Sequence, residues 1–140
     1  MATENLPIAE YALLSDCRSA ALVSREGSID WLCMPRFDGP SVFARLLDAT
    51  AGHWSLHPAG AFEARRRYVE GTMVLETTFE TESGMVVLLD ALAVGATDEG
   101  HDLGTGSPGS SSEAWNARAA RSRWSWSTRP GSSTVWSTLS

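Results

Sequence analysis

The sequence contains no lysine, only two cysteines and no long apolar run. The cysteines, Cys17 and Cys33, are too few for a disulfide scaffold and lack the spacing of metal ligands. No stretch approaches the roughly 18 consecutive apolar residues of a membrane span. The N-terminal residues MATENLPIAEY also lack the basic and apolar regions of a secretory signal. These absences predict a cytoplasmic protein with no membrane segment, no metal and no cofactor.

The charge of the chain is unevenly distributed. Residues 1–104 hold 16 acids and 7 arginines, a net charge of −9, whereas residues 105–140 hold one acid and four arginines, a net charge of +3. The hydrophobic fraction of 43% over 140 residues is an ordinary value for one globular domain. The charge difference indicates that two kinds of sequence have been joined.

The longer part has the pattern of an antiparallel β protein. Short apolar or alternating runs predict strands at residues 19–24, 28–34, 53–57, 62–69, 72–80 and 85–89. The first two runs flank Arg25-Glu26-Gly27, where glycine suits a positive φ, and therefore predict a hairpin. A second hairpin joins the last two runs, and one face of its first strand carries the side chains of Met73, Leu75, Thr77 and Phe79.

One short helix is expected among these strands. Ser41 suits an N-cap after Gly39-Pro40, the apolar residues of 42–47 fall at helical spacing, and Gly52 suits the end of the segment. Strands without a matching set of helices predict an all-β fold, an antiparallel β-sandwich of the super-sandwich kind. The edges of such sheets need cover from further strands or from a neighbouring domain.

The C-terminal part, residues 109–140, is predicted to be an irregular, disordered tail that follows a partial sandwich domain at residues 1–108. Residues 105–140 are rich in Ser, Arg and Gly, hold four of the six tryptophans, and show no sustained period of 2 or 3.6. Arginine and tryptophan together invite a nucleic-acid interpretation. Four arginines are too few to carry it, so no nucleic-acid partner is expected.

The segment GSIDWLCMPRFDGPSVFARLL, residues 27–47, holds the residues best suited to chemistry on a sugar. Glycoside hydrolysis uses two carboxylates on opposite sides of a bond, a role open to Asp30 and Asp38 with Trp31 and Arg36 nearby. However, Asp30 is expected to be an outward-facing strand acid and Trp31 a core residue. Asp38 before Gly-Pro suits a turn in which its side chain bonds backbone N–H groups. We therefore assign no catalytic residue.

Other polar groups predict no site. His53 and His57 share a strand face but lie about 13 Å apart at strand rise, too far to share a metal ion. The arginines at 65–67 alternate between two faces, so a solvated or acid-paired edge is a better interpretation than an anion clamp. No phosphate loop, dinucleotide fingerprint or nucleophile elbow is present.

Three stretches resemble the N-terminal region of bacterial glycoside hydrolase family 15, the glucoamylase and trehalase group. They are IAEYALLSDCRSAALVSREGSIDWLCMPRFDGPSVFARLLD, AGHWSL and RRRYVEGTMVLETTFETESGMVVLLDALAVG, and the resemblance covers residues 8–108. It implies a β-sandwich that precedes an (α/α)6 barrel carrying the two catalytic glutamates, with trehalose or another α-glucoside as the full-length protein's substrate. No counterpart of the barrel is present, so the resemblance implies a fragment that is inactive alone. At most Trp31, Arg36 and Asp38 would contact a sugar.

A change of reading frame would account for the point at which the resemblance ends. The absence of lysine and the abundance of Ala, Gly, Arg and Val indicate a GC-rich gene. Residues 120–130, written in GC-rich codons and read one base earlier, give Glu-Val-Glu-Val-Glu-Leu-Glu-Tyr-Ala-Pro, an alternating strand. Tryptophan has a single codon, so Trp-Ser-Trp at 124–126 constrains this alternative. We hypothesise that one base is missing between the codons for residues 105 and 112.

Three functions remain open from the sequence. The first, which we favour, is a non-catalytic N-terminal domain fragment of a glucoamylase- or trehalase-like hydrolase. The second is a free-standing β-module that binds a carbohydrate or a partner. The third is a small enzyme that uses Asp30 and Asp38.

Overall fold

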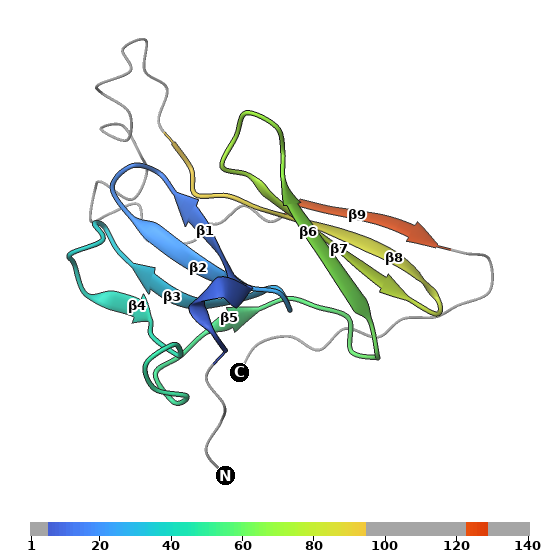
Figure 1. Ribbon diagram of the computed structural model, residues 1–140, viewed down its shortest axis with the longest axis horizontal. Helices are drawn as coiled ribbons and strands as arrows, with labels where there is room; N and C mark the ends of the chain where they lie inside the picture. The colour runs from blue at the N-terminus through green and yellow to red at the C-terminus, as the bar shows by residue number, and fades with distance from the viewer. Residues whose placement is uncertain (1–5, 95–122, 129–140) are drawn as a thin grey trace.

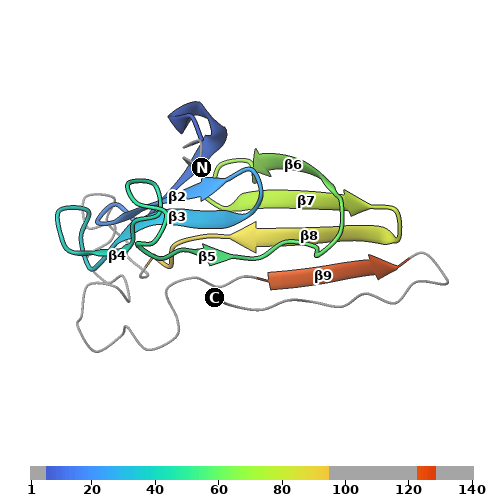
Figure 2. The ribbon, with the colours of Figure 1, turned by 90° about the horizontal axis from the view of Figure 1, so that it is seen from below.

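The computed structural model describes residues 6–94 and the backbone of a strand at residues 123–128. This part of the chain forms two antiparallel sheets that meet in a shared core (Figures 1 and 2). The all-β sandwich expected from the sequence is therefore confirmed.

The first sheet is formed by the N-terminal half of the chain. A 3-10 turn, η1 (Ile8–Glu10), leads into its strands β1 (Tyr11–Ser15), β2 (Ala20–Ser24), β3 (Ser28–Cys33), β4 (Ser41–Phe43) and β5 (Trp54–Ser55). The strand order is β1-β2-β3-β4, and β5 pairs with the beginning of β3. Two register shifts, between Leu22 and Val23 and between Leu32 and Cys33, interrupt the alternation along β3 and its neighbours.

The second sheet is a meander with one strand from the C-terminal part. Its strands are β6 (Glu63–Tyr68), β7 (Leu75–Thr81), β8 (Gly84–Asp90) and β9 (Arg123–Thr128), in that order. Strands β7 and β8 form the second expected hairpin, in which Leu75, Thr77 and Phe79 are buried as predicted. Met73 precedes the strand and is 43% exposed, so it does not share their buried face.

Gly27 in the β2–β3 turn confirms the expected hairpin and also joins the two sheets. Its φ is +75°, and its N–H donates to the Ser24 carbonyl at 3.0 Å. A Cβ at this position would lie 2.7 Å from the Leu56 carbonyl oxygen and 2.9 Å from the Phe79 ring. Glycine is therefore required both by the turn and by the close approach of the second sheet.

The expected helix after Ser41 is wrong. Residues Ser41–Phe43 form strand β4, whose Phe43 and Ser41 pair with Leu32 and Cys33 of β3. Two turns follow: the Leu47 and Asp48 N–H groups donate to the Ala44 carbonyl at 2.9 and 3.1 Å, and the Ala51 N–H donates to the Asp48 carbonyl at 2.9 Å. Pairing with the preceding strand β3 prevails over the local helical spacing, which spans too few residues to stabilise a helix alone.

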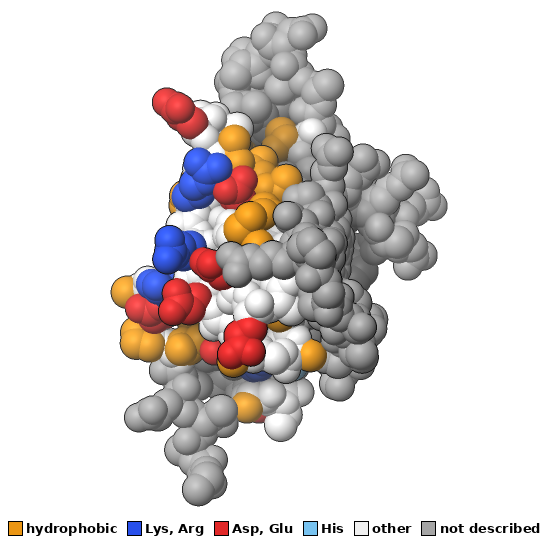
Figure 3. Space-filling view, turned by 90° about the vertical axis from the view of Figure 1, so that its right-hand side faces the viewer, with side chains coloured by type: hydrophobic (Ala, Val, Ile, Leu, Met, Phe, Trp, Pro, Cys, Tyr) orange, Lys and Arg blue, Asp and Glu red, His pale blue; other side chains and the backbone are white. Residues whose placement is uncertain are grey.

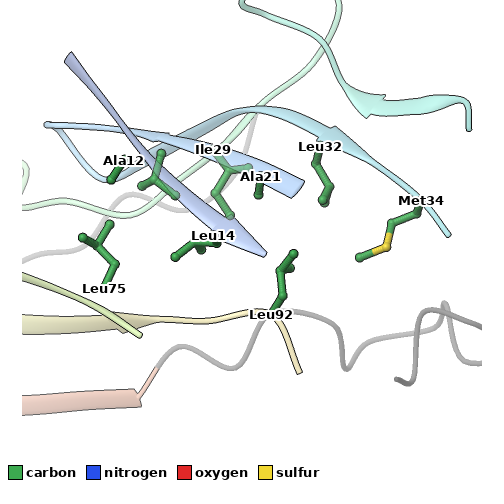
Figure 4. Close-up of a cluster of buried hydrophobic side chains, with 9 residues drawn as sticks. Ala12, Leu14, Ala21, Ile29, Leu32, Met34, Leu75 and Leu92 are labelled. Carbon is green, nitrogen blue, oxygen red and sulfur yellow. The ribbon is translucent and has the colours of Figure 1, made fainter. Parts of the chain in front are cut away.

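Two clusters of buried side chains fill the interior. The first, drawn in Figure 4, comprises Ala12, Leu14, Ala21, Val23, Ile29, Leu32, Met34, Leu75 and Leu92. Leu75 and Leu92 come from the second half of the chain and face the side chains of β1 and β3 across the core. The second cluster is Phe79, Val86 and Leu88, with Leu56, Phe62 and Ala64 packed against it. Each large apolar side chain buried here contributes roughly 1.5–3 kcal/mol.

Two side chains of β6 cover the open edge of the first sheet. Arg66 donates to the Val23 and Glu10 carbonyls at 3.1 and 2.7 Å. The Tyr68 hydroxyl donates to the Leu13 carbonyl at 2.8 Å and accepts from the Leu13 N–H at 2.9 Å. Because β1 is an edge strand, this hydroxyl takes the place of a strand partner.

Strand β9 lies in the segment for which the sequence predicts an irregular tail. Its backbone pairs with β8 along Arg123–Thr128, in a register that sets Trp124 opposite Leu88 and Trp126 opposite Val86. The sequence predicts no regular element at these six residues, so this strand is an addition to the expected fold. The rest of 109–140, the expected boundary at 108 and His101 lie outside the described residues.

Candidate functional site

The β3–β4 loop carries the two exposed charges that the sequence associates with a sugar. Its backbone is closed by hydrogen bonds from Met34 N–H to the Pro40 carbonyl (3.3 Å) and from Gly39 N–H to the Arg36 carbonyl (2.9 Å). A third bond, from Phe37 N–H to the Arg18 carbonyl at 2.8 Å, fastens the loop to the β1–β2 turn. The loop is therefore held in one shape although it lies at the surface.

Arg36 and Asp38 form a two-point ion pair on this loop. The Arg36 Nε lies 2.9 Å from Asp38 Oδ1, and one terminal nitrogen lies 3.1 Å from Oδ2. Their side chains are 62% and 55% exposed. The expectation that Asp38 bonds backbone N–H groups is wrong, because its carboxylate is bonded to the guanidinium. Phe37 between them is 69% exposed.

Trp31 does not join this pair. It lies on β3, half-buried, with Leu22 as its register partner on β2. No side-chain hydrogen bond is found for its indole within the described part of the chain. Trp31 was expected in the core and is only half-buried. Of the three residues that the sequence associates with a sugar, only Arg36 and Asp38 contact each other.

Asp30 is the centre of a buried polar network. It is only 2% exposed, so the expectation of an outward-facing acid is wrong. Its Oδ1 lies 2.8 Å from an Arg45 nitrogen and accepts from the Ser28 hydroxyl at 2.6 Å, while Oδ2 accepts from the Tyr11 hydroxyl at 2.9 Å. Arg45 also donates to the Ser28 hydroxyl at 3.0 Å.

The network is explained by the way the chain passes over β3. The Leu46 N–H donates to the Asp30 carbonyl at 3.1 Å, so the turn after β4 runs along β3 and brings Arg45 to the carboxylate. A carboxylate removed from water is tolerated only when paired and hydrogen-bonded. Burial, followed by the hydrogen bond to Asp30, raises the pKa of Tyr11 to about 12 and keeps its hydroxyl a donor.

Sequence reasoning missed Tyr11 and Arg45. An available signal was the position of Asp30 between apolar neighbours in SIDWLC, which implies burial and hence a cationic partner. Both oxygens of the Asp30 carboxylate have partners within the fold, the Tyr11 hydroxyl at Oδ2 and the Ser28 hydroxyl and Arg45 guanidinium at Oδ1.

The histidines and cysteines among residues 6–94 make separate contacts. The His57 Nδ1 lies 3.0 Å from the Pro58 carbonyl, and its ring contacts Phe62 at a centroid distance of 5.6 Å. Cys17 is exposed, and burial raises the pKa of the Cys33 thiol. Within residues 6–94, no group of three or more His, Cys, Asp or Glu side chains is arranged to hold a metal ion.

The arginine run of β6 is used by the fold. Arg67 lies 2.7 Å from the Glu76 carboxylate on β7, which confirms acid pairing at this strand, and Arg66 is bonded to backbone carbonyls. Figure 3 shows basic, acidic and hydrophobic side chains mixed over the described part of the face that it presents. Among the described residues, no helix is long and apolar enough to cross a membrane.

Comparison with known proteins gives one consistent result. The family described as "Trehalase-like, N-terminal" matches residues 1–112. A trehalase of Mycolicibacterium smegmatis is 48% identical over 100 residues, which are 71% of this chain and 14% of that protein. A trehalase of Mycobacterium tuberculosis is 46% identical over 98 residues, 69% of this chain and 14% of the relative.

The similarity extends beyond mycobacteria but covers the same small share of each relative. "Trehalase 2" of Sulfolobus acidocaldarius is 40% identical over 83 residues, 59% of this chain and 14% of that protein. No solved structure matches the chain. The chain thus spans about one seventh of the length of the curated relatives that it matches.

Proposed function

The chain belongs to the trehalase-like N-terminal domain family. On this basis we propose that it is the non-catalytic N-terminal domain of a longer hydrolase that cleaves the α-glucosidic bond of trehalose. The observation that carries the proposal is the family match over residues 1–112, together with trehalases of which the chain spans only 14%. The resemblance to family 15 supports the further proposal that an (α/α)6 barrel supplies both catalytic glutamates. A cytoplasmic location belongs to the same proposal.

The geometry supports a non-catalytic role. Hydrolysis of a glycoside needs an acid and a base that face the scissile bond from opposite sides. Asp30 is buried and bonded to Tyr11, Ser28 and Arg45, while Asp38 is bound to Arg36 at the surface. Neither carboxylate has the free, partly desolvated position that a general acid requires, which argues against a small enzyme built on these two residues.

Within the full-length protein we assign the β3–β4 loop a positioning role. Arg36 and Asp38 are exposed, fixed in one geometry and able to bond sugar hydroxyls or a neighbouring domain. Trp31, half-buried on β3, would supply a stacking surface at most. Turnover should therefore weaken, without being lost, when Arg36 or Asp38 is replaced by alanine in the full-length enzyme.

Two measurements test the proposal. The purified 140-residue chain should release no glucose from trehalose, maltose or starch, because it supplies no acid–base pair. A chimera of the Mycolicibacterium smegmatis trehalase, with its matching 100 residues exchanged for those of this chain, should hydrolyse trehalose within about tenfold of its parent, or ~1.4 kcal/mol. Glucose release by the fragment that is abolished by Asp38→Asn would overturn the proposal, as would a folded but inactive chimera.

A free-standing binding module is the competing function. Titration of the chain with maltose or trehalose, followed by tryptophan fluorescence, separates the two. A saturable change would favour the module, whereas a flat response favours a domain that acts only within a longer protein.

The boundary of the domain is a proposal of the same kind. The family match ends at residue 112, the last position of the window of 105–112 in which the codon argument places a missing base. Taking the break near the middle of that window, we assign residues 1–108 to the partial sandwich domain and the remainder to out-of-frame translation. Genomic DNA across codons 100–140 and beyond decides this, because a continuous barrel-coding frame must resume one base earlier.

A further inference from the structure

The outward face of the first sheet carries a row of large apolar side chains. Strands β1, β2 and β3 lie side by side in that sheet (Figure 1). Their pairing sets Leu13 opposite Leu22, and Leu22 opposite Trp31. Residues directly opposite one another on neighbouring strands belong to the same face of a sheet. Because Ala12 and Leu14 on either side of Leu13 belong to the buried core, this row lies on the face turned away from the core.

The row is accessible, and the strands around it carry no charge on β1 and β2. Leu13 is 44% exposed, and Leu22 and Trp31 are half-buried. On β3 the Asp30 carboxylate is paired with Arg45. A sheet face in contact with water usually carries polar and charged residues. Here the outward positions of β1 and β2 are Tyr11, Leu13, Ser15, Ala20, Leu22 and Ser24.

The outward face of β6 and β7 in the second sheet is different. Arg67 and Glu76 form an ion pair at 2.7 Å across these two strands. The outward apolar residues of β8 border strand β9 instead. The outward positions of β6 and β7 are Glu63, Arg65, Arg67, Glu76, Thr78 and Glu80. That face has the charges of a surface that stays in water, whereas the row on the first sheet has the composition of a covered surface.

The composition of the row indicates what covers it. An uncharged face has no attraction for an anion or a nucleic acid. The Leu13 N–H and carbonyl are both bonded to the Tyr68 hydroxyl, so at this residue β1 has no backbone group left for an added strand. The covering group must therefore lie on the side chains of the row, and an apolar protein surface fits that requirement.

The size of the face favours a surface on the same polypeptide over a separate protein. Three strands of five or six residues span roughly 15 Å by 17 Å, or about 250 Å², at the usual strand spacing and rise. A stable complex between separate proteins buries ~800 Å² on each partner. A smaller apolar contact suffices when both surfaces belong to one chain, because the effective concentration is then high.

We propose that the outward face of β1, β2 and β3, centred on Leu13, Leu22 and Trp31, docks onto the part of the full-length protein that follows this domain. The family description places the domain at the N-terminal end, and about six sevenths of each trehalase lies outside the matched region. The inference rests on the proposed function in one respect, which is that a longer protein surrounds the domain. It concerns no step of hydrolysis.

Thiol accessibility tests the docking. In a Cys17→Ser background, Leu13→Cys places a thiol in the row, and Glu80→Cys places one on the charged face of β7 as the matched control. Both variants are made in the 140-residue chain and in the trehalase chimera, and alkylation at the new thiol is followed by peptide mass spectrometry without trehalose. The Leu13→Cys thiol should react about tenfold more slowly in the chimera than in the chain. The Glu80→Cys thiol should react equally fast in both.

A second substitution shows whether the row causes the protection. Leu22→Glu in the chimera places a carboxylate beside the Leu13→Cys thiol and should restore most of its reactivity, because burying an unpaired charge opposes docking. Thr78→Glu, on the outward face of β7, should leave the protection unchanged. If the 140-residue chain does not fold, the comparison is made within the chimera, where the Leu13→Cys thiol should react about tenfold more slowly than the Glu80→Cys thiol.

Three results would overturn the proposal. They are equal reactivity of the Leu13→Cys thiol in the chain and the chimera, protection that Leu22→Glu leaves intact, and protection in the chain that grows with its concentration. The last would identify a second copy as the occupant. An active chimera with a reactive Leu13→Cys thiol contradicts the docking alone. A folded but inactive chimera with a protected thiol supports the docking and contradicts only the proposed function.

Discussion

Asp30 and Asp38 belong to one short segment of sequence but have opposite surroundings. Asp30, in the middle of β3, is 2% exposed and bonded to Tyr11, Ser28 and Arg45. Asp38, on the next loop, has a side chain that is 55% exposed and bonded to Arg36. A buried carboxylate depends on every partner it has, whereas an exposed one is solvated whether or not its partner is present. The two acids should therefore differ sharply in what their removal costs.

The largest expected effect is that of Asp30→Ala. The substitution leaves the Arg45 guanidinium and the Tyr11 and Ser28 hydroxyls without their acceptor. Breaking a buried ion pair costs about 3–5 kcal/mol, and we expect the lower end because the Arg45 side chain is 31% exposed. Urea unfolding measures the loss, with Asp38→Ala as the matched control. A loss below about 1 kcal/mol for Asp30→Ala would mean that the network contributes little.

Thr77 is a third case, a buried polar group without a partner. Its residue is fully buried on β7 between Leu75 and Phe79, and its hydroxyl accepts and donates no hydrogen bond within the described residues. Thr77→Val removes the desolvated hydroxyl at nearly constant shape and should stabilise the fold by about 1–2 kcal/mol. Thr78→Val, on the opposite face of the same strand, is the control and should change the stability little. Destabilisation by Thr77→Val would show that the hydroxyl is bonded in solution.

Tyr11 should make the fold sensitive to alkali. Its pKa is raised to about 12 from an ordinary value of 10.0, first by burial and then by the hydrogen bond and charge of Asp30. Between pH 10 and 12 the folded protein therefore keeps a Tyr11 proton that the unfolded chain loses. The contribution of Tyr11 to the free energy of unfolding is full below pH 10 and falls as the pH rises toward 12. Tyr11→Phe should cost about 1 kcal/mol near neutral pH and flatten that alkaline decline.

Denaturant midpoints recorded across pH 9 to 12 measure this effect. The parent chain and Tyr11→Phe should converge in stability as the pH rises. A parallel decline of the two curves would assign the alkaline loss to other groups.

The comparison also indicates what the sequence could predict. Both hairpins followed from local rules, because Gly27 marks its turn and residues 75–79 alternate along β7. The partners of Asp30 did not follow, since they depend on the register shifts of β3 and on the turn that brings Arg45 along that strand. The helix expected after Ser41 failed for a related reason, because Ser41–Phe43 pair with β3 instead. In each case a contact between two strands or turns overrode the local pattern.

In the candidate site, too, local contacts differ from those that depend on strand pairing. Arg36 and Asp38 are two residues apart on one loop, so their pairing is a local contact, although the sequence analysis expected Asp38 to bond backbone N–H groups instead. Trp31 depends on how β2 and β3 pair, and the sequence gives no means of relating its position to the loop. Strand β9 was missed because only its two tryptophans mark the alternation, and its partner β8 lies far away in sequence.

The smallest expected effect is that of breaking the Arg36–Asp38 pair. Both side chains are more than half exposed, so water replaces the lost partner, and such pairs contribute about 0.2–1 kcal/mol or less. Arg36→Ala, Asp38→Ala and the double variant should each unfold within about 1 kcal/mol of the parent, with the double variant no worse than the sum of the two. High salt should reduce even this difference, because the pair is accessible to ions. A loss comparable to that of Asp30→Ala would show that the loop, fastened through Phe37 to the Arg18 carbonyl, holds the β1–β2 turn in place. The contrast between the two acids would then reflect loop connectivity rather than burial.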